Sequence, residues 1–461
     1  MSEYYNKFIK DSKIKAFDLE HRMKINYNIS KYHVAVEKGR KLYKDLELAR
    51  KRASSIKHRI INNLEKYLVE FVANFEKNGG KIIWATDEQE AVREILSIVQ
   101  KAEGKVVVKS KSMTTEEIGI NEAFEKHGIE SVETDLGEYI VQLAGEKPYH
   151  IVTPAMHKSK EDVAELFHEK INTPRESSPE QMTGYVREIL REKFLNADIG
   201  MTGCNFLIAD SGAISVTENE GNALMTMSFP KIHIVIAGIE KIIPSLTDLD
   251  LFLPLLATHG TGQYMTVYNS IISGPRRADE TDGPDEMFLI LLENNRSEVL
   301  KHEKQRPSLM CIRCGACLNA CPVYKNIGGH TYHTTYSGPI GSVITPHLRG
   351  MKEFGHLSYA SSLCGSCTEV CPVKIPLHEM LLYNRNENVV SGHSGFSERM
   401  SMQGMKRMLM KRKRLDLINS GLKNFGMQMM FKKTWGSGRE LPKFASKSFH
   451  ELWLQQEKTQ P

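Results

Sequence analysis

The sequence predicts an α/β domain built on a parallel sheet, followed by a smaller, mainly helical region that is rich in cysteine. Two observations predict this fold class. Between about residues 81 and 295, short β-branched runs alternate with stretches of helical periodicity, which is the pattern of parallel strands joined by crossover helices. Seven of the eight cysteines then lie within residues 311–371, where strand character is low.

The size and composition are those of a soluble globular protein. The 461 residues correspond to between two and four domains at roughly 100 to 200 residues each. The chain is 41% hydrophobic and 25% charged, and no apolar stretch reaches the roughly 18 residues of a membrane span. The N-terminal segment MSEYYNKFIKDSKIK lacks the apolar core of an export signal. We therefore expect a cytoplasmic protein and exclude a disulfide-stapled miniprotein.

Four regions follow along the chain: a helical N-terminal arm (1–75), the α/β domain (76–300), the cysteine-rich domain (301–396) and a basic, Met-rich helical tail (397–461). In the arm, apolar residues at spacings of three and four predict helix; they are Ile60, Leu64, Leu68 and Phe71. In the tail, the same spacing predicts an amphipathic helix through Leu415, Ile418, Leu422 and Phe425.

Within the α/β domain, the first predicted elements are strands at 81–85, 105–109 and 131–133 and helices at 88–101 and 115–127. Further runs of strand character are expected to extend the same sheet; they lie at 149–152, 206–208, 213–216, 232–237, 265–272 and 288–292. A Gly/Pro/Asp-rich segment, SGPRRADETDGPDE, precedes the last run and predicts a surface loop.

The net charge is only +5, but the two ends of the chain are basic. Residues 399–433 hold ten Lys/Arg and a single acidic residue, Asp416. Such a segment is typical of a solvated helix that docks on a partner, and it could also contact an anionic membrane surface. No aromatic residues are interleaved with these charges as in nucleic-acid platforms, so nucleic-acid binding is not expected.

The first cysteine group carries a specific signature. Cys311, Cys314, Cys317 and Cys321 follow the spacing C-x2-C-x2-C-x3-C, with Pro322 next. This is the bacterial ferredoxin run, in which three thiolates hold one iron–sulfur cluster and the fourth cysteine reaches another.

The second group, Cys364, Cys367 and Cys371, follows the spacing C-x2-C-x3-C and also precedes a proline. Crossed ligation assigns Cys371 to cluster 1, together with Cys311, Cys314 and Cys317, and leaves Cys321, Cys364 and Cys367 for cluster 2. The missing fourth ligand falls in register at Ser361. A [3Fe–4S] centre, a [4Fe–4S] centre with a non-cysteine ligand, and recruitment of Cys204 all remain open for cluster 2.

Zinc is the alternative metal for such cysteine pairs, but seven cysteines do not divide into two four-thiolate sites. The region also holds five histidines, for which local hydrogen bonding is the simpler interpretation than metal ligation. They are His330, His333, His347, His356 and His378.

The chain resembles the lactate utilisation protein B family of iron–sulfur proteins over nearly its whole length. The segments that carry the resemblance are KSKSMTTEEIGINE, ETDLGEYIVQ, ADIGMTGCNFLIADSGAISVTENEGN, CIRCGACLNACPVYKNIGGHTY, YSGPIG and SSLCGSCTEVCPVKIPLHEML. The resemblance implies that the α/β part is a lactate-utilisation (LUD) domain, similar in fold to ribose-phosphate isomerases and CoA transferases. It also implies two [4Fe–4S] clusters, the second with three cysteine ligands.

The resemblance further implies a role in oxidising L-lactate to pyruvate with two companion subunits, one a cysteine-rich iron–sulfur protein and one with a LUD domain. Our first hypothesis is an electron-transfer subunit of such a complex. The alternative is that the LUD domain itself oxidises the 2-hydroxy acid or transfers an acyl group. No GxGxxG fingerprint follows a strand, so the sequence does not indicate a nucleotide cofactor.

Two segments of the α/β domain are candidate binding sites for L-lactate or pyruvate. Lys109, Ser110, Lys111 and Ser112 follow a predicted strand, where α/β sheets bind ligands; alternatively they form a turn before a helix capped by Thr114 with Glu117. The second segment is the turn Asn219, Glu220, Gly221 and Asn222. It is similar to the ENG-type turn of CoA transferases, so Glu220 is the candidate catalytic residue, although it and Glu218 could equally face solvent.

Overall fold

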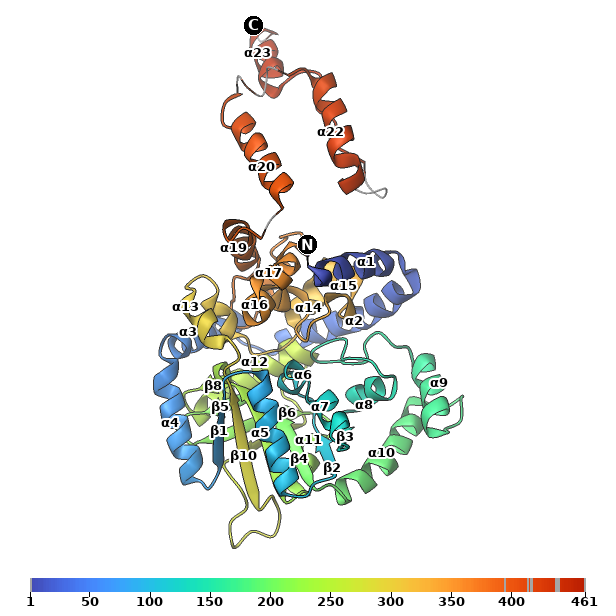
Figure 1. Cartoon of the computed structure of the whole chain (residues 1–461), viewed down its shortest axis with the longest axis vertical. Coiled ribbons are helices and arrows are strands. Elements are labelled where there is room, and N and C mark those ends of the chain that lie inside the picture. The colour runs from blue at the N-terminus through green and yellow to red at the C-terminus, as the bar shows by residue number, and fades with distance from the viewer. Residues whose placement is uncertain (1, 394, 413, 415–417, 436–439, 460–461) are drawn as a thin grey trace. The chain divides into compact units, whose positions relative to one another are not determined.

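The structure, a computed structural model, describes residues 2–393, 395–412, 414, 418–435 and 440–459 (Figure 1). Residues 1–388 form one compact unit and residues 389–461 form a second. The N-terminal region is helical, as predicted, and consists of α1 (Glu3–Phe17), α2 (Leu19–Arg40), α3 (Leu46–Asn62) and α4 (Leu64–Lys77).

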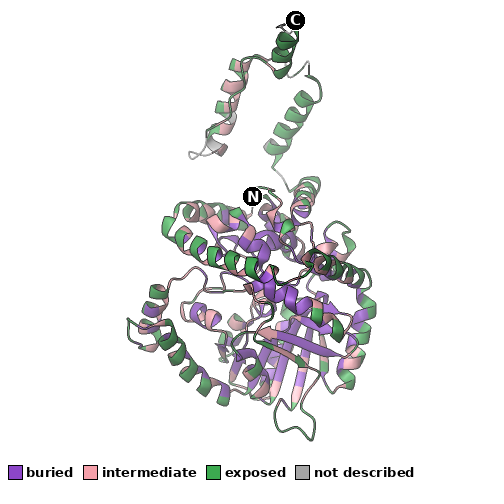
Figure 2. Ribbon diagram, turned by 180° about the vertical axis from the view of Figure 1, so that it is seen from behind, coloured by how far each residue is buried: buried purple, intermediate pink, exposed green. Residues whose placement is uncertain are grey.

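The predicted parallel sheet is confirmed. It has six strands in the order β1-β10-β7-β4-β2-β3, and every neighbouring pair is parallel. Its strands are β1 (Lys81–Ala85), β2 (Val106–Lys109), β3 (Glu130–Glu133), β4 (Ile199–Gly203), β7 (Ile232–Gly238) and β10 (Glu286–Leu292). The central strands are buried on both faces (Figure 2), which explains why they are near-continuous apolar runs in the sequence.

Helices cover this sheet, and their ends follow local capping rules. Asp87 caps α5 (Glu88–Lys101), as its side chain accepts a hydrogen bond from Glu90 N. The single helix predicted for 115–127 is instead two helices, because Gly119 adopts φ +63°, a left-handed conformation that ends a helix. The covering helices are α6 (Met113–Glu117), α7 (Ile120–Lys126), α8 (Leu136–Leu143), α9 (Lys160–Ile171), α10 (Pro179–Leu195) and α11 (Asn222–Ser228).

Three of the strand runs expected to extend the parallel sheet belong to a second sheet, so that expectation was wrong. This sheet has the order β8-β5-β6-β9, with β5–β6 and β6–β9 antiparallel. Its strands are β5 (Phe206–Ile208), β6 (Ala213–Glu218), β8 (Ile242–Ile243) and β9 (Tyr268–Ile272). Four residues separate β5 from β6 in the chain, a separation that suits a hairpin and is too short for a parallel crossover.

The strand predicted at 149–152 is absent: these residues form a loop. His150 Nδ1 accepts from Val152 N at 3.1 Å and Thr153 N at 3.2 Å, so this backbone is bonded locally. The apolar side chains that suggested a strand are buried instead against the cysteine-rich domain, where Tyr324 donates its hydroxyl to Tyr149 O at 2.8 Å.

The cysteine-rich domain is mainly helical, as predicted. Its helices are α13 (Arg296–Lys301), α14 (Ala316–Ala320), α15 (Pro322–Ile327), α16 (Gly338–Arg349), α17 (Met351–Phe354), α18 (Ser366–Glu369) and α19 (Leu377–Val390). A nearly fully buried helix of the α/β domain, α12 (Leu249–Thr261), packs against α2 and α3. One continuous apolar core joins the N-terminal helices, the second sheet and the cysteine-rich domain. Most of the clustered cysteines are part of this core.

The carboxyl ends of the parallel strands face this domain. β10 leads directly to α13, which packs against α16 of the cysteine-rich domain, whereas the loop before β10 lies at the far end of the sheet (Figure 1). The carboxyl edge of the sheet therefore lies beside the cysteine-rich domain. Ligands of open α/β sheets bind beyond this edge, so a ligand bound there would lie near the cysteines.

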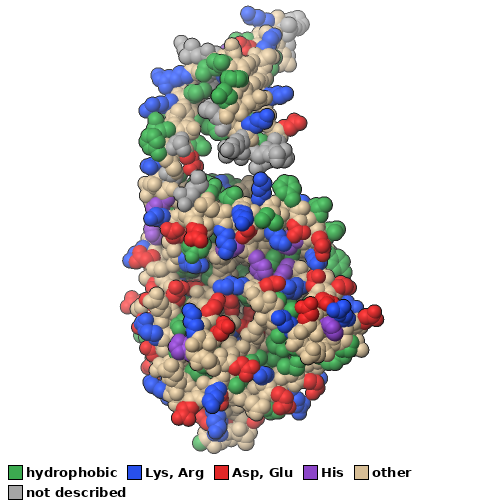
Figure 3. Space-filling view, turned by 45° about the vertical axis from the view of Figure 1, so that its right-hand side comes forward, with side chains coloured by type: hydrophobic (Ala, Val, Ile, Leu, Met, Phe, Trp, Pro, Cys, Tyr) green, Lys and Arg blue, Asp and Glu red, His purple; other side chains and the backbone are tan. Residues whose placement is uncertain are grey.

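The second unit contains α20 (Phe396–Leu409), α22 (Ser420–Trp435) and α23 (Phe449–Thr459). Of the residues through which a helix was predicted, Leu422 and Phe425 lie in α22, and Ile418 precedes it; Leu415 lies outside the described residues. None of the described helices combines the length and the apolar character needed to cross a bilayer. On the face drawn in Figure 3, acidic and basic side chains are interspersed over the first unit, without a broad field of one sign.

Candidate metal centres and the adjoining cavity

The first four-cysteine group lies around one small cavity. Cys311, Cys314, Cys317 and Cys371 all line it, and its remaining wall is mostly apolar, with Ile340 among the residues. Three of these cysteines come from the loop before α14 and from α14 itself, and Cys371 follows α18, which packs against α14. The structure therefore brings together the four residues that the spacing groups in cluster 1.

Backbone amides already point at these sulfurs. Arg313 N donates to Cys311 Sγ at 3.4 Å, and Ile375 N donates to Cys371 Sγ at 3.3 Å. Burial raises the pKa of Cys371 to about 11. Burial and the neighbouring thiols also raise the pKa of Cys317 well above its usual value. Buried thiols with raised pKa values become thiolates together only beside a positively charged partner, which a metal cluster would supply.

The second group is more open. Cys321 precedes α15 and accepts from Tyr324 N at 3.5 Å, Cys367 is buried on α18, and Cys364 is exposed. The Cys364 thiol lies 3.4 Å from Ser366 Oγ, and this contact lowers its pKa. Ser361, the residue in register with a fourth ligand, accepts a hydrogen bond from Leu363 N at 3.1 Å.

The donor set of the first group fits an iron–sulfur site. Four cysteines line one small, mostly apolar cavity, and three of them belong to the C-x2-C-x2-C-x3-C run. In that run these three thiolates each bind a different iron of a cubane, whereas a structural zinc site needs only four ligands around one ion.

All five histidines of the cysteine-rich domain have hydrogen-bond partners, but those of His330 and His333 lie in the α/β domain and the N-terminal arm and are not local. These are His330 with Lys147 O, His333 with Asp11, His347 with Asn384, His356 with Glu353 O and His378 with Thr368.

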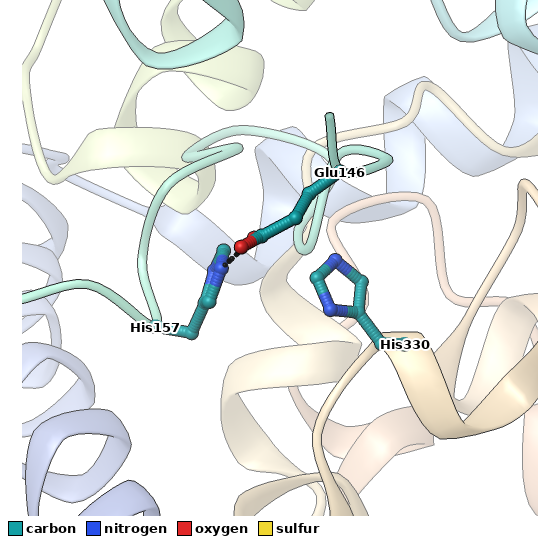
Figure 4. Close-up of side chains that lie close together, drawn as sticks. All are labelled: Glu146, His157 and His330. Atoms are coloured by element: carbon teal, nitrogen blue, oxygen red, sulfur yellow. Dashed lines mark hydrogen bonds and ion pairs between the residues drawn. The ribbon is translucent and has the colours of Figure 1, made fainter. Parts of the chain in front are cut away.

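His330 also belongs to a group of possible ligands with Glu146 and His157 (Figure 4). The Glu146 carboxylate is already bonded to His157 Nε2 at 2.6 Å and to Lys158 Nζ at 2.7 Å. The hydrogen bond from His157 is the largest influence that lowers the Glu146 pKa to about 2. Because Lys158 is already paired with the Glu146 carboxylate, this group fits a polar contact between domains better than a cation site.

A cavity of about 710 Å³ adjoins the first cysteine group. One side is formed by the turns after β2, β4 and β6, and the other by α2, α12 and the cysteine loop. Ile151, Arg313 and Cys314 line both this cavity and the small cavity of the first cysteine group. A ligand in the larger cavity would therefore lie beside the first centre.

Two cationic side chains in this wall were not singled out from the sequence. Arg313 stands inside the CIRC run, where a charged residue among small and apolar ones is the only signal. Lys241 follows β7, at the carboxyl edge of the sheet. Lys241 directly follows Glu240, whose Oε1 accepts from Arg313 Nη2 at 3.3 Å, so the two cations belong to the same part of the wall. Burial lowers the pKa of Lys241.

The candidates at 109–112 divide between two roles. Ser110, Lys111 and Ser112 line the cavity, and Lys111 Nζ bonds to Asp135 at 3.1 Å and Val152 O at 3.0 Å. Lys109 is not among the lining residues. Its buried ammonium lies 2.7 Å from Glu133, with Glu116 at 3.5 Å.

The helix after this turn, α6, is not capped by the residues that the sequence suggested. The N-cap of α6 is Ser112, whose hydroxyl accepts from Thr115 N, and not Thr114. Glu117 does not cap the helix: its carboxylate bonds to Arg296 at 2.8 Å and accepts from the Tyr336 hydroxyl at 2.6 Å.

The turn at 219–222 also lines the cavity through Asn219, Glu220 and Asn222. Gly221 adopts φ +77°, which a side chain would strain. Glu220 Oε2 accepts from Leu136 N at 3.1 Å. Glu218 caps α11 by accepting from Ala223 N and Leu224 N, both at 2.8 Å.

Cys204 lines the cavity as well. Burial is the main cause that raises the pKa of its thiol to about 12, which the charge of Lys241 opposes. It therefore sits in the cavity wall as a neutral thiol, apart from the second cysteine group.

Two family models match the chain, the LUD domain over residues 68–292 and the 4Fe-4S dicluster domain over residues 307–375. Lactate utilization protein B of Bacillus subtilis (strain 168) is 46% identical over 354 residues, which cover 76% of this chain and 74% of the relative. The Bacillus licheniformis protein of the same name is 46% identical over 353 residues, with the same coverage. A crystal structure of a DUF162 family protein from Deinococcus radiodurans matches 50% of this chain and 98% of its own, at 13% identity and a TM-score of 0.28, which is too loose a match to carry an argument.

Proposed function

Since the chain belongs to the lactate utilization protein B family, we propose that it is the iron–sulfur subunit that carries electrons away from L-lactate during its oxidation to pyruvate. The observation that supports this role best is the shared wall of the two cavities. Arg313 and Cys314 line both the space for a small ligand and the space enclosed by the first four cysteines. Substrate and electron acceptor would then be neighbours.

We assign Cys311, Cys314, Cys317 and Cys371 to the first [4Fe–4S] cluster, and Cys321, Cys364 and Cys367 to the second. With three thiolates, the second site fits a [4Fe–4S] centre with one non-cysteine ligand or a [3Fe–4S] centre. When bound, each cluster accepts one electron at a time. The chain itself supplies the buried, apolar wall around the first site and the amide donors that stabilise its thiolates.

Oxidation of L-lactate to pyruvate releases two electrons and two protons. A separate group is needed to take the electron pair. The proposal therefore includes the two companion subunits that the family resemblance implies, one cysteine-rich and one with a LUD domain. A reducing, cytoplasmic compartment is part of the proposal, since seven clustered thiols would otherwise form disulfides.

The experiment is anaerobic addition of L-lactate to the reconstituted protein, with visible absorbance of the oxidised clusters as the readout. The same run is repeated with both companion proteins present. We expect bleaching only in their presence. Bleaching by the protein alone would contradict the relay role and place the oxidising site in this chain.

The second candidate function is catalysis by the LUD domain itself. The observation in its favour is that the turn containing Glu220 lines the cavity directly. In this alternative, Glu220 acts on the bound 2-hydroxy acid, and its replacement abolishes turnover.

We further propose that the tail docks on a companion subunit. Its described helices expose many large apolar side chains; on α20 these are Phe396, Met400, Met402, Met405, Met408 and Leu409. Removal of residues 399–461 should release the protein from its complex while both clusters remain. If the full-length chain is found in membrane fractions and the truncated chain is not, the tail is instead a peripheral membrane anchor.

A further inference from the structure

The cationic end of the large cavity has the properties of a built anion site. The side chain of Arg313 is only 7% exposed, and its guanidinium is held on two sides. Nη2 donates to Glu240 Oε1 at 3.3 Å, and the guanidinium carbon lies 4.5 Å from the centre of the Tyr336 ring. The Tyr336 hydroxyl is in turn bonded to Glu117, so the platform under the guanidinium is fixed.

This arrangement leaves one end of the guanidinium free. Arg313 Nη1 is buried and has no hydrogen-bond partner within the described residues. A buried, unpaired donor on a charged group is costly, and Arg313 lines the cavity. The free donor is therefore available for a ligand in that space.

Lys241 also lines the cavity, and it directly follows Glu240, the partner of Arg313, in the chain. No hydrogen bond or ion pair of its ammonium occurs among the described residues. The other cavity-lining lysines differ: Lys111 bonds to Asp135, and Lys158 bonds to Glu146. Arg313 and Lys241 are thus the cations that the protein leaves without full partners.

The other charged groups of the cavity suit an anion less well. Asp135, Glu218 and Glu220 also line it, and an ionised carboxylate would repel a negatively charged group. Lys111 lies among them but is already paired with Asp135, so the positive charge available to a ligand is that of Arg313 and Lys241. A small ligand with one carboxylate would be oriented by these charges.

We propose that Arg313 and Lys241 bind the carboxylate of the 2-hydroxy acid and of its 2-oxo product. This proposal rests on the proposed function for the identity of the acid. The carboxylate lies between the two cations, and the hydroxyl-bearing carbon lies toward Cys314. Arg313 thereby joins substrate binding to the loop that holds the first cluster.

The test measures binding and not turnover. The probe is pyruvate, titrated calorimetrically and anaerobically into the full-length, cluster-loaded protein, with pyruvamide as its uncharged counterpart. We expect pyruvate to bind and pyruvamide to bind at least about tenfold more weakly. Arg313→Gln and Lys241→Gln should each weaken pyruvate binding about 10- to 100-fold, the effect of losing a charged hydrogen bond.

Lys352→Gln is the matched control, since it removes an exposed positive charge from α17, outside the cavity. This variant should bind pyruvate with the same affinity as the wild type. Arg313 already adopts φ +60°, so glutamine adds no new backbone strain there. Visible absorbance confirms that each variant keeps its clusters. If Arg313→Gln loses them, Lys241→Gln decides the test, because Lys241 is not in a cysteine loop.

A competing role for these cations is to balance the charge of the first cluster. In that case the variants would shift the cluster's midpoint potential but leave pyruvate affinity unchanged, which overturns the proposal. Failure of the wild type to prefer pyruvate over pyruvamide overturns it as well. If pyruvate does not bind but L-lactate bleaches the assembled complex, the electron-transfer function stands and the binding site is rejected. Arg313-dependent binding without bleaching supports the site and rejects that function.

Discussion

Arg313 of the first cysteine loop and Glu240 of the α/β domain form a buried ion pair, with Nη2 3.3 Å from Oε1. The same carboxylate bonds to Arg296 Nε at 2.7 Å. Burial opposes ionisation of Glu240, but the charges of Arg296 and Arg313 outweigh it and lower its pKa to about 2. One buried carboxylate therefore ties the sheet to the cysteine loop and to α13.

Glu240→Gln should be strongly destabilising. It leaves two buried guanidiniums with one carboxylate fewer, and breaking a buried pair costs about 3–5 kcal/mol. The measurement is the urea dependence of unfolding at pH 7.5, together with iron content after reconstitution. Glu298→Gln is the control, because its ion pair with Lys301 is exposed. A loss below about 1 kcal/mol for Glu240→Gln would show that this junction is not held by charge.

Crossed ligation predicts which centre each cysteine variant removes. Cys321→Ala and Cys364→Ala should abolish only the second centre, whereas Cys371→Ala should damage the first, because Cys371 lines the same cavity as Cys314. Low-temperature electron paramagnetic resonance on each reduced variant separates the two signals. Cys204→Ala is the control and should retain both. Loss of the first signal in Cys321→Ala would reject the assignment.

Elements governed by local sequence were predictable, and those governed by distant contacts were not. The strand at 81–85 and the helix at 88–101 have the predicted bounds, because apolar periodicity and an aspartate cap specify them locally. The strand β4 was missed, since IGMTG contains two glycines and owes its conformation to pairing with β2 and β7. The second sheet was missed although the short separation of β5 and β6 in the chain indicates a hairpin; the pairing of β6 with β9 and of β5 with β8 joins distant segments and is not specified by strand composition.

The same contrast holds at the site. Ligand spacing is a local property, so the sequence grouped the cysteines that the structure brings together. Lys109 and Lys111 lie in one turn but have different surroundings in the fold. Lys109 is buried with Glu116 and Glu133, whereas Lys111 pairs with Asp135 and lines the cavity. Residue type alone did not separate these roles. The cavity itself depends on docking between two domains, which no single motif encodes.

The stability of the first unit should fall as the pH is lowered through 6.5, in part because of His233. This residue is fully buried in the sheet, and its Nε2 lies 2.8 Å from Thr202 Oγ1. Burial lowers its pKa to about 3. The stabilising effect of a depressed pKa is complete above the unfolded value of about 6.5 and is lost as the pH falls toward the folded value.

Between pH 7.5 and pH 5.0 this single histidine should cost about 2 kcal/mol, since the unfolded chain binds a proton that the folded sheet refuses. His233→Gln keeps a hydrogen-bonding side chain but cannot titrate, so the difference in urea midpoint between the two pH values should shrink. His127→Gln, at an exposed position, should leave it unchanged. An equal pH dependence in His233→Gln and the wild type would mean that His233 is not the neutral group we infer.

Glu220→Gln separates the electron-carrier role from catalysis by the LUD domain. In the structure, Glu220 accepts a backbone hydrogen bond from Leu136 N, and the side-chain oxygen of glutamine can accept the same bond. We therefore expect lactate turnover in the assembled complex to stay within a few-fold of the wild type, with unchanged pyruvate affinity. Glu180→Gln, at an exposed position on α10, is the control.

A nucleophile or general base at this position would behave differently. Its loss should reduce turnover by at least about 100-fold while binding persists. That result would move the chemistry into the turn at 219–222, across the cavity from Arg313. The electron-carrier hypothesis would then describe only the path by which electrons leave that site.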